Sequence, residues 1–179
     1  YFYNITGGDV ILLSENTEIL YMGTEQKPNA LNPETPPIYP ASAYIISDTK
    51  DYEFANNGGK YFYNRTANPN RDGLGEAISY LENGQSTLIC SSGMAAISTT
   101  LFSLLKSGDH AIFSKDIYGE TIELISMLRN YGIDITTADF TDINALKTLF
   151  KANTKLVYTE IIANPLTQVV DIEEISYLA

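Results

Sequence analysis

The spacing of apolar and polar residues changes near residue 60. Before that point five prolines lie close together, at Pro28, Pro33, Pro36, Pro37 and Pro40. Proline fixes φ and removes a backbone donor, so this pattern predicts an extended arm with short turns over residues 1–60. The segment PPIYPASAYII (36–46) is too apolar and aromatic to lie free in water, and we expect the arm to dock on a partner.

After about residue 70, helical apolar spacing alternates with short apolar runs. The helical spacing predicts helices over 72–83, 92–106, 119–130 and 142–151, and the start of another at 172. The short runs predict strands over 86–90, 110–113, 133–138 and 155–162. We expect Ser92 to cap the second helix, and Gly108 and Asp109 to form a turn. The alternation indicates an α/β fold whose mainly parallel sheet carries helices on both faces.

Composition narrows the classes of function. A formal net charge of -11 argues against nucleic-acid binding, which needs clustered lysines and arginines. No apolar run approaches the roughly 20 residues that span a bilayer, and the first residues lack the basic flank of a secretory signal. We therefore expect a cytoplasmic protein with no membrane partner. The chain has one cysteine, Cys90, expected to be a buried structural thiol, and one histidine, His110, so we expect no metal site.

Candidate chemistry lies where the predicted strands end, because ligands of such sheets bind at the carboxyl ends of the strands. The run SSGMAA (91–96) opens a helix, and Gly93 would let an anion approach the first-turn amides; tight packing against the sheet is the alternative. Tyr118, in DIYGET (116–121), would place a ring at the mouth of the sheet, unless it is a core or rim tyrosine. Glu160 and Asn164 follow the last strand, where a polar pair is poorly explained by stability.

A further candidate pair precedes the sheet. Tyr63 and Arg65 lie two residues apart in YFYNRTANP (61–69) and would project to the same side of an extended segment. Both side chains can donate to one phosphate, although an ordinary surface arginine beside a packed tyrosine would look the same.

In combination and in this order, the motifs Y-x-R-x-x-N-P, S-S-G-M-A-A, D-x-Y-G-x-T and E-x-x-x-N-P-x-x-x-V-x-D-I resemble the Cys/Met-metabolism branch of the fold-type I pyridoxal-phosphate enzymes. This branch includes cystathionine γ-synthase and methionine γ-lyase. The resemblance runs from about Pro36 to the last residue. It implies an aspartate aminotransferase-like fold in which residues 61–179 form the N-terminal part of the large, cofactor-binding domain, after the arm.

The resemblance also implies a role for each motif around pyridoxal 5'-phosphate. The start of the helix at Ser92, Gly93 and Met94 would hold the phosphate of the chain's own cofactor. Tyr118 would stack on the pyridine ring and act on the leaving group. Asn164 would hydrogen-bond the ring 3-hydroxyl, and Glu160 would support the pocket.

Tyr63 and Arg65 would bind the cofactor phosphate of a neighbouring subunit. The resemblance thus implies active sites that are shared between subunits, in a homotetramer built as a dimer of dimers.

The activity implied is elimination or replacement at a sulfur amino acid. We expect γ-elimination on methionine or a related amino acid; γ-replacement, as in O-acetylhomoserine sulfhydrylase or cystathionine γ-synthase, and cystathionine γ-lyase activity stay open. Cystathionine-handling relatives often carry an arginine where this chain has Glu123, and together with Glu120 this favours a substrate with a neutral tail, unless both glutamates face solvent.

The family supplies two further groups after the last motif: an aspartate for the pyridine nitrogen and a lysine that carries the cofactor. The chain contains neither, so we expect it to be an incomplete part of such an enzyme and inactive by itself. The alternative is a non-catalytic partner subunit that lends Tyr63 and Arg65 to a full-length homologue.

Overall fold

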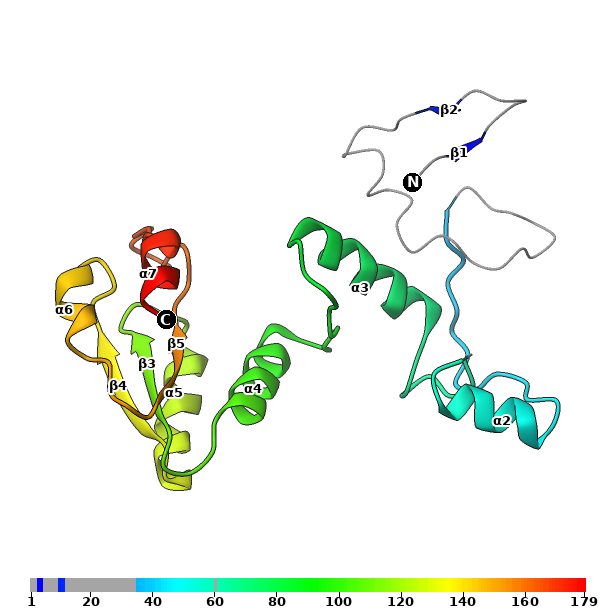
Figure 1. Ribbon diagram of the computed structural model, residues 1–179, viewed down its shortest axis with the longest axis horizontal. Helices are drawn as coiled ribbons and strands as arrows, with labels where there is room; N and C mark the ends of the chain where they lie inside the picture. Colours follow the sequence, from blue (N-terminus) through cyan, green and yellow to red (C-terminus); the bar gives the residue numbers. More distant parts are fainter. Residues whose placement is uncertain (1–2, 5–9, 12–34, 60) are drawn as a thin grey trace. The chain divides into compact units, whose positions relative to one another are not determined.

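A computed structural model describes residues 3–4, 10–11, 35–59 and 61–179 of the chain. It divides into two compact units, Tyr1–Ile89 and Cys90–Ala179, which are described separately below (Figure 1). The division falls after residue 89 and not after residue 60, where the sequence pattern changes. The prolines Pro28 and Pro33 lie outside the described residues.

The described residues of the first unit form two short strands and two helices. Strands β1 (Tyr3–Asn4) and β2 (Val10–Ile11) pair antiparallel. Helix α2 (Thr49–Asn56) lies within the stretch that was expected to be extended with short turns, so that expectation is wrong for these residues. The helix forms because Asp48 caps it, with its Oδ1 accepting a hydrogen bond from the Asp51 amide at 2.8 Å.

Residues 37–44 are hydrogen-bonded to the start of α3 (Pro69–Leu81) in the same unit. The Asn70 side chain accepts from the Tyr39 amide and donates to the Pro37 carbonyl, each at 2.7 Å. Asn68 caps α3 and donates to the Tyr39 carbonyl at 3.2 Å. Two asparagine side chains thus hold this part of the arm against α3, and its docking on a partner stays a prediction.

The strand expected over 86–90 is not formed. These residues run without a strand partner, and Leu88 is 73% exposed. The segment instead lies against α3, where a Cβ on Gly75 would come within 3.3 Å of the Thr87 carbonyl oxygen and where the Ser79 and Thr87 hydroxyls are 2.7 Å apart. A strand requires a hydrogen-bonding neighbour, and none of the described residues provides one here.

The second unit is built around a parallel sheet with strand order β4-β3-β5. The central strand β3 (His110–Ser114) pairs with β4 (Asp134–Ala138) from His110↔Asp134 onward and with β5 (Thr154–Tyr158) on its other side. Every residue of β3 is buried. The three strands confirm the predicted positions, except that β5 ends at Tyr158 and not at 162.

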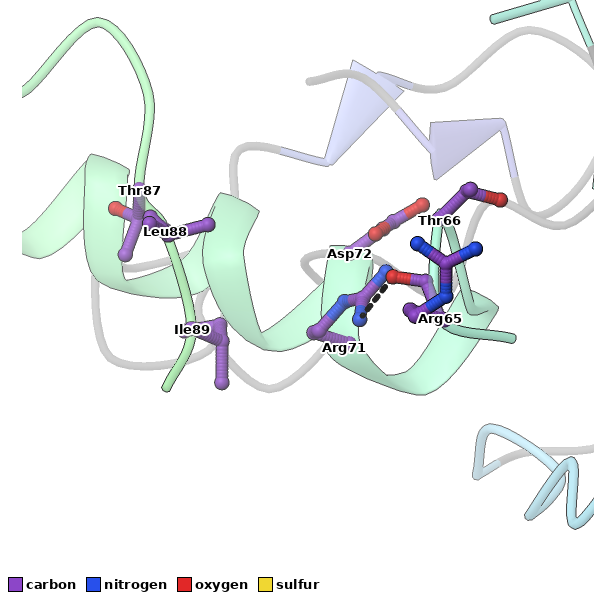
Figure 2. A pocket seen from close by; sticks show the side chains of 7 residues that line it. All are labelled: Arg65, Thr66, Arg71, Asp72, Thr87, Leu88 and Ile89. Carbon is purple, nitrogen blue, oxygen red and sulfur yellow. Dashed lines mark hydrogen bonds between the residues drawn. The ribbon is translucent and has the colours of Figure 1, made fainter. Parts of the chain in front are cut away.

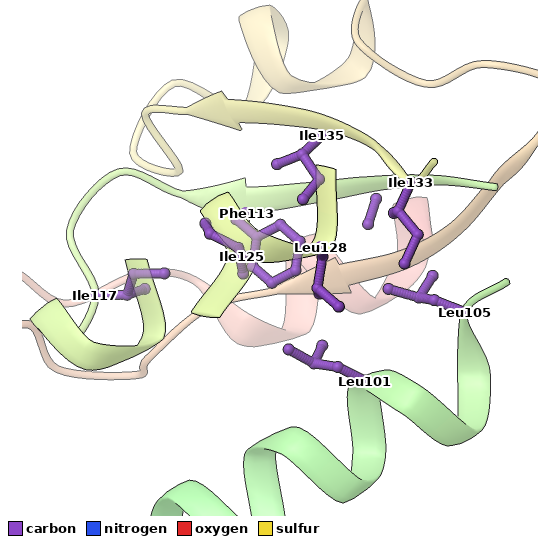
Figure 3. Packing of buried hydrophobic residues seen from close by; sticks show 9 residues of the cluster. Leu101, Leu105, Phe113, Ile117, Ile125, Leu128, Ile133 and Ile135 are labelled. Carbon is purple, nitrogen blue, oxygen red and sulfur yellow. The ribbon is translucent and has the colours of Figure 1, made fainter. Parts of the chain in front are cut away.

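Helices cover both faces of this sheet, as predicted. On one face α4 (Gly93–Leu104) and α5 (Gly119–Leu128) pack against Phe113, Ile135 and their neighbours (Figure 3). On the other face Ile112 packs against α6 (Ile143–Lys147) and α7 (Ile172–Leu178). Alternate residues of β3 therefore pack into two separate apolar clusters, one on each face of the sheet. This pattern fixes which face of the sheet each side chain of the strand lies on.

Several boundaries differ from the prediction. Helix α6 is shorter than the expected 142–151, and α5 gives way to the 3-10 turn η1 (Arg129–Tyr131), which ends at Gly132 with φ 79°. The expected turn at Gly108 is confirmed, with φ 90°. Cys90, expected to be buried, is only half-buried. No described helix is long and apolar enough to cross a membrane.

Candidate active site

The second unit brings the ends of β3 and β5 together at one edge of the sheet. After β3 the chain passes through Lys115–Ile117 and enters α5 at Gly119, with Tyr118 as the N-cap residue. After β5 it reaches Glu160 within two residues. The predicted segments at 115–119 and 160–165 are therefore neighbours in space, as expected for strands that end at the same edge.

Glu160 and Tyr118 are joined by a direct hydrogen bond. The Tyr118 amide donates to Glu160 Oε1 at 2.8 Å, across 42 residues of sequence. No side chain caps α5, so this carboxylate satisfies an amide at the helix start that has no intrahelical partner. The Tyr118 ring itself is 56% exposed. Glu160 thus fixes the backbone of Tyr118 while the ring faces outward, available to a ligand.

The start of α4 is an open cradle of backbone amides. Ser92 is the N-cap residue, and its Oγ accepts from the Ala95 amide at 3.1 Å, which confirms the predicted cap. The amides of Gly93 and Met94, in the first helical turn, have no intrahelical acceptor. A Cβ built on Gly93 would have no heavy atom within 4 Å, so the space beside this residue is open. Two unbonded amides, an open approach and the positive end of the helix suit a phosphate group.

A buried residue that the sequence analysis did not single out links the two helix starts. Thr121 is 0% exposed, and its Oγ1 lies 3.8 Å from Met94 Sδ. It also interacts with Tyr158, whose pKa is raised by burial and by the nearby Glu160 and lowered by the Thr121 hydroxyl. The last position of D-x-Y-G-x-T was the available signal: a threonine one turn into a helix faces the same side as the cap residue.

Asn164 lies in a loop that folds back on itself. Ile162 pairs with Val169 in an isolated bridge, and the Ala163 amide donates to the Gln168 carbonyl at 2.9 Å. Asn164 is exposed, and within the described part of the chain no hydrogen bond joins it to Tyr118, Glu160 or Gly93. Asn164 thus follows Glu160 by four residues in the chain, but these hydrogen bonds do not connect it to the other candidate residues.

Tyr63 and Arg65 belong to the first unit. The segment is a turn and not extended as expected: the Thr66 amide and Oγ1 both bond to the Tyr63 carbonyl, at 3.0 and 2.7 Å. Even so, the two side chains lie together, with Arg65 Cζ 5.4 Å from the centroid of the Tyr63 ring. Arg65 also lines a pocket of about 210 Å³ whose other members are Thr66, Arg71, Asp72, Thr87, Leu88 and Ile89 (Figure 2).

No group of three or more His, Cys, Asp or Glu side chains in the described residues is arranged to hold a metal ion. The charged groups of the second unit that do pair are at its surface, for example Lys115 with Asp139 at 2.7 Å. The candidate site consequently consists of backbone amides, one exposed aromatic ring and one carboxylate in the second unit, and an arginine with a tyrosine in the first.

Comparisons with known proteins agree on one family. Residues 16–179 match the family described as Cys/Met metabolism PLP-dependent enzyme. An L-methionine gamma-lyase of Fusobacterium nucleatum is 39% identical over 146 residues, 80% of this chain and 37% of the relative. A cystathionine beta-lyase of Bacillus subtilis is 39% identical over 144 residues, 80% of this chain and 35% of the relative.

Solved structures with a similar fold are also enzymes of sulfur amino acid metabolism. A putative O-acetylhomoserine (thiol)-lyase of Campylobacter jejuni, which holds a pyridoxyl-lysine group, superposes with a TM-score of 0.82 at 31% identity over 94% of this chain. A cystathionine gamma-lyase of Lactobacillus plantarum in complex with L-serine gives 0.80 at 33% identity over 93%. The chain covers 42% of each of these two structures.

Proposed function

The chain belongs to the Cys/Met metabolism PLP-dependent enzymes, and from that premise we propose that the protein carrying it is a carbon–sulfur lyase that performs γ-elimination on methionine or a related amino acid. The observation that carries the proposal is the hydrogen bond between the Tyr118 amide and Glu160, because it sets an exposed aromatic ring at the edge of the sheet where ligands bind. Pyridoxal phosphate, when bound, withdraws electrons from the substrate carbons and so makes their bonds easier to break.

The residues present fit this cofactor. Gly93 and Met94 would hold its phosphate through their amides, since the cradle at the start of α4 is open and Ser92 keeps the helix start ordered. Tyr118 would stack on the ring with its exposed face. Asn164 would reach the ring hydroxyl from the loop after β5, and that loop would have to approach the ring for the contact to form.

Tyr118 is also the candidate acid in this part of the chain. Its hydroxyl would donate its proton to the sulfur that leaves as the carbon–sulfur bond breaks. Glu160 does not touch the reacting atoms in this scheme; it is a positioning residue that holds the Tyr118 backbone. The reaction therefore depends on Glu160 through geometry, and on Tyr118 directly.

The preference for a neutral substrate tail rests on two glutamates. Glu120 and Glu123 lie in the first turns of α5 beside Tyr118, and both are exposed. Solvent exposure was the alternative named for both residues, so they favour a neutral tail only if the far end of the substrate comes near them; a carboxylate there would be repelled, whereas the thioether of methionine would not. Similarity to methionine gamma-lyases agrees with this preference. Replacement at the γ-carbon, which needs a second sulfur substrate, and γ-elimination on cystathionine are the alternatives within the same scheme.

A second candidate is β-elimination on cystathionine. Cystathionine beta-lyases of Bacillus subtilis and Lactococcus lactis are as similar to this chain as the methionine gamma-lyases, at 39% and 41% identity. The two activities differ in which carbon–sulfur bond breaks, and the residues that select the bond need not lie in this chain.

We also propose that Tyr63 and Arg65 act in the site of a neighbouring copy, in a homodimer that forms part of a tetramer. Both residues are exposed and adjacent, and neither lies in the unit that contains the amide cradle. Two such half-sites would complete each other in a symmetric dimer.

The test is to identify the products of the full-length protein that carries this chain, purified with pyridoxal phosphate and given methionine or cystathionine. Methionine and water give methanethiol, ammonia and 2-oxobutanoate by γ-elimination. Cystathionine and water give pyruvate, ammonia and homocysteine by β-elimination, but 2-oxobutanoate, ammonia and cysteine by γ-elimination. We expect 2-oxobutanoate from methionine. Pyruvate from cystathionine with no methionine cleavage would replace the proposal by the second candidate, and no oxo acid from either substrate would contradict both.

A further inference from the structure

We propose that Arg71 is a second phosphate-binding arginine, which acts together with Arg65 on the cofactor phosphate of the neighbouring subunit. The inference rests on the function proposed for Arg65 and extends it to a residue on α3 that no motif above includes. Arg71 lies in the first turn of α3 and lines the same pocket as Arg65 (Figure 2).

The placement of positive charge is the first argument. The chain has three arginines, Arg65, Arg71 and Arg129, and a net charge of -11, yet two of the three line one pocket. The ion pairs found among the described residues all use lysines: Lys115, Lys147 and Lys151. No described carboxylate lies within ion-pairing distance of Arg65 or Arg71. In an acidic protein, two neighbouring guanidiniums without a counterion mark a place prepared for an anion.

The acidic residue on the pocket wall is already engaged. Asp72 lines the pocket beside the two arginines, but its carboxylate interacts with the Tyr61 hydroxyl and raises that group's pKa, with burial, to about 12. Tyr61 consequently stays protonated and keeps a hydrogen bond available to Asp72. The aspartate thus has a partner in Tyr61, and the two arginines outnumber it in the pocket lining.

Geometry is the second argument. Arg71 Nη1 donates to the Arg65 carbonyl at 3.5 Å, which holds the two residues next to each other. The other guanidinium donors of Arg71 are left for a ligand, and Arg65 Cζ lies above the Tyr63 ring on the other side of the same turn. Thr66 and Thr87 add hydroxyl groups to the pocket lining. Planar guanidinium forks match the oxygens of a phosphate better than a point charge does.

Helix chemistry is the third argument. The first turn of a helix favours acidic residues, because unsatisfied amides place partial positive charge there. An arginine in the first turn of α3 is therefore unfavourable for the helix itself. The same partial positive charge attracts an anion. The start of α3 therefore disfavours Arg71 alone, but it favours Arg71 together with a bound phosphate.

The experiment compares pyridoxal phosphate with pyridoxal, which lacks the phosphate, as ligands of the cofactor-free full-length protein. Arg71→Gln is measured beside Arg65→Gln and Arg71→Lys. Arg129→Gln is the matched control, because Arg129 also donates to one backbone carbonyl, that of Ile135 at 3.3 Å, but lies in the second unit. We expect Arg71→Gln to weaken pyridoxal phosphate binding about five- to tenfold and to leave pyridoxal binding unchanged, as for the loss of one charge-assisted hydrogen bond.

Arg71→Lys should recover part of that loss, and Arg129→Gln should show none of it. If Arg65→Gln weakens pyridoxal phosphate binding but Arg71→Gln behaves like Arg129→Gln, the inference is wrong while the function proposed for Arg65 stands. Equal weakening of pyridoxal and pyridoxal phosphate by Arg71→Gln would also overturn it, since that pattern reports a structural role. If Arg65→Gln changes neither ligand, the proposed function of the first unit itself fails.

Discussion

Gly93 illustrates at the residue scale how the absence of a side chain creates a site. Its amide lies at the start of α4, and the space that a Cβ would fill is open. An alanine would meet no protein atom there but would stand in the path of a ligand approaching the amides. Stability and ligand binding should therefore respond to the same substitution in opposite ways.

We expect Gly93→Ala to leave the protein as stable as before or up to about 1 kcal/mol more stable, because alanine favours the helix. Pyridoxal phosphate should bind at least about tenfold more weakly, as expected when hydrogen bonds to a charged group are lost. Thermal unfolding of the cofactor-free protein and a cofactor titration measure the two effects. Gly84→Ala, whose Cβ would make only ordinary contacts at 3.9 Å, is the control. Unchanged cofactor affinity would show that the cradle at α4 does not hold the phosphate.

Glu160 is a second residue whose contribution can be separated into charge and geometry. Glu160→Ala removes the acceptor of the Tyr118 amide, whereas Glu160→Gln keeps an oxygen in the same place. We expect kcat/KM to fall about tenfold or more for alanine and clearly less for glutamine, since a hydrogen bond to a charged group is worth about 1.5–3 kcal/mol. Steady-state kinetics measure the difference, with the exposed Glu173→Gln as control. Equal losses for both substitutions would mean that the negative charge, and not the position of Tyr118, is what matters.

At the element scale, the segment 37–44 and helix α3 act as one structural piece because of Asn68 and Asn70. Asn70 bonds both a carbonyl and an amide of the segment, as a neighbouring strand would. A few residues further on, the segment pairs with the turn that carries Tyr63, through the Ala43↔Tyr63 bridge. The position of the proposed phosphate-binding turn thus depends on two amide side chains at the start of a helix.

Substituting Asn70 should therefore release the segment locally. We expect Asn70→Ala to lower the free energy of unfolding by about 1–3 kcal/mol, because it leaves a half-buried amide and carbonyl without their partner. Amide hydrogen exchange should speed up at Tyr39 and at residues 42–44 and stay unchanged in β3, which belongs to the other unit. Asn70→Asp, which keeps the acceptor for the Tyr39 amide but loses the donor to Pro37, should fall between alanine and the unchanged protein. Unchanged amide exchange at Tyr39 would contradict the claim that Asn70 holds segment 37–44 against α3.

The sheet offers an element-scale prediction about pH. His110 is fully buried at the start of β3, with Nδ1 2.7 Å from Thr154 Oγ1 and Nε2 2.9 Å from Thr136 Oγ1. Burial, and to a lesser degree Lys151, lowers its pKa, while Asp134 acts in the opposite direction. The folded protein therefore favours neutral histidine. Its contribution to stability is complete above the unfolded pKa of about 6.5 and is lost as the pH falls toward the lower folded pKa.

We expect the free energy of unfolding of the unchanged protein to decrease below about pH 6.5 more steeply than that of His110→Asn, which has no titrating ring. Denaturant unfolding at a series of pH values measures the difference. Carboxylates that do not interact with His110, such as Asp139, titrate in both proteins and cancel in the comparison. Parallel curves over this range would show that His110 does not couple folding to protons.

The scale of the element also shows what the sequence could predict. Strands β3 and β4 and helices α4 and α5 were found because apolar spacing reports burial, and β3 is buried at every position. Residues 86–90 looked equally apolar, but a strand is a property of a pair, and its neighbour cannot be read from one segment. Helix α2 was not predicted because the sequence indicates its start only by one capping residue, Asp48. The prolines that precede it predicted an extended segment instead. Arg71 was missed because a lone arginine has no pattern; only the pocket shows that it has a neighbour.

At the scale of the whole molecule, the proposed site is divided between two copies of the chain. An Arg65→Gln subunit would damage the site of its neighbour, and a Tyr118→Phe subunit would damage its own. If both variants are unfolded together and reassembled in equal amounts, half of the dimers are hybrids with one intact site of two. About a quarter of the sites should then work, although each variant alone is nearly inactive. Activity that stays at the level of the separate variants would place Arg65 and Tyr118 in the same subunit's site.

The cradle at the start of α4 has one more consequence. Its binding atoms belong to the main chain, and among the common amino acids only proline removes a backbone N–H. An ancestor with such a cradle could exchange residues around the substrate freely and still keep its cofactor. Relatives that cut different bonds, a methionine gamma-lyase and a cystathionine beta-lyase, differ from this chain at about three positions in five and yet match the same family. If the cradle holds the cofactor as proposed, the reaction can change through side chains around the substrate while the main chain keeps its binding atoms.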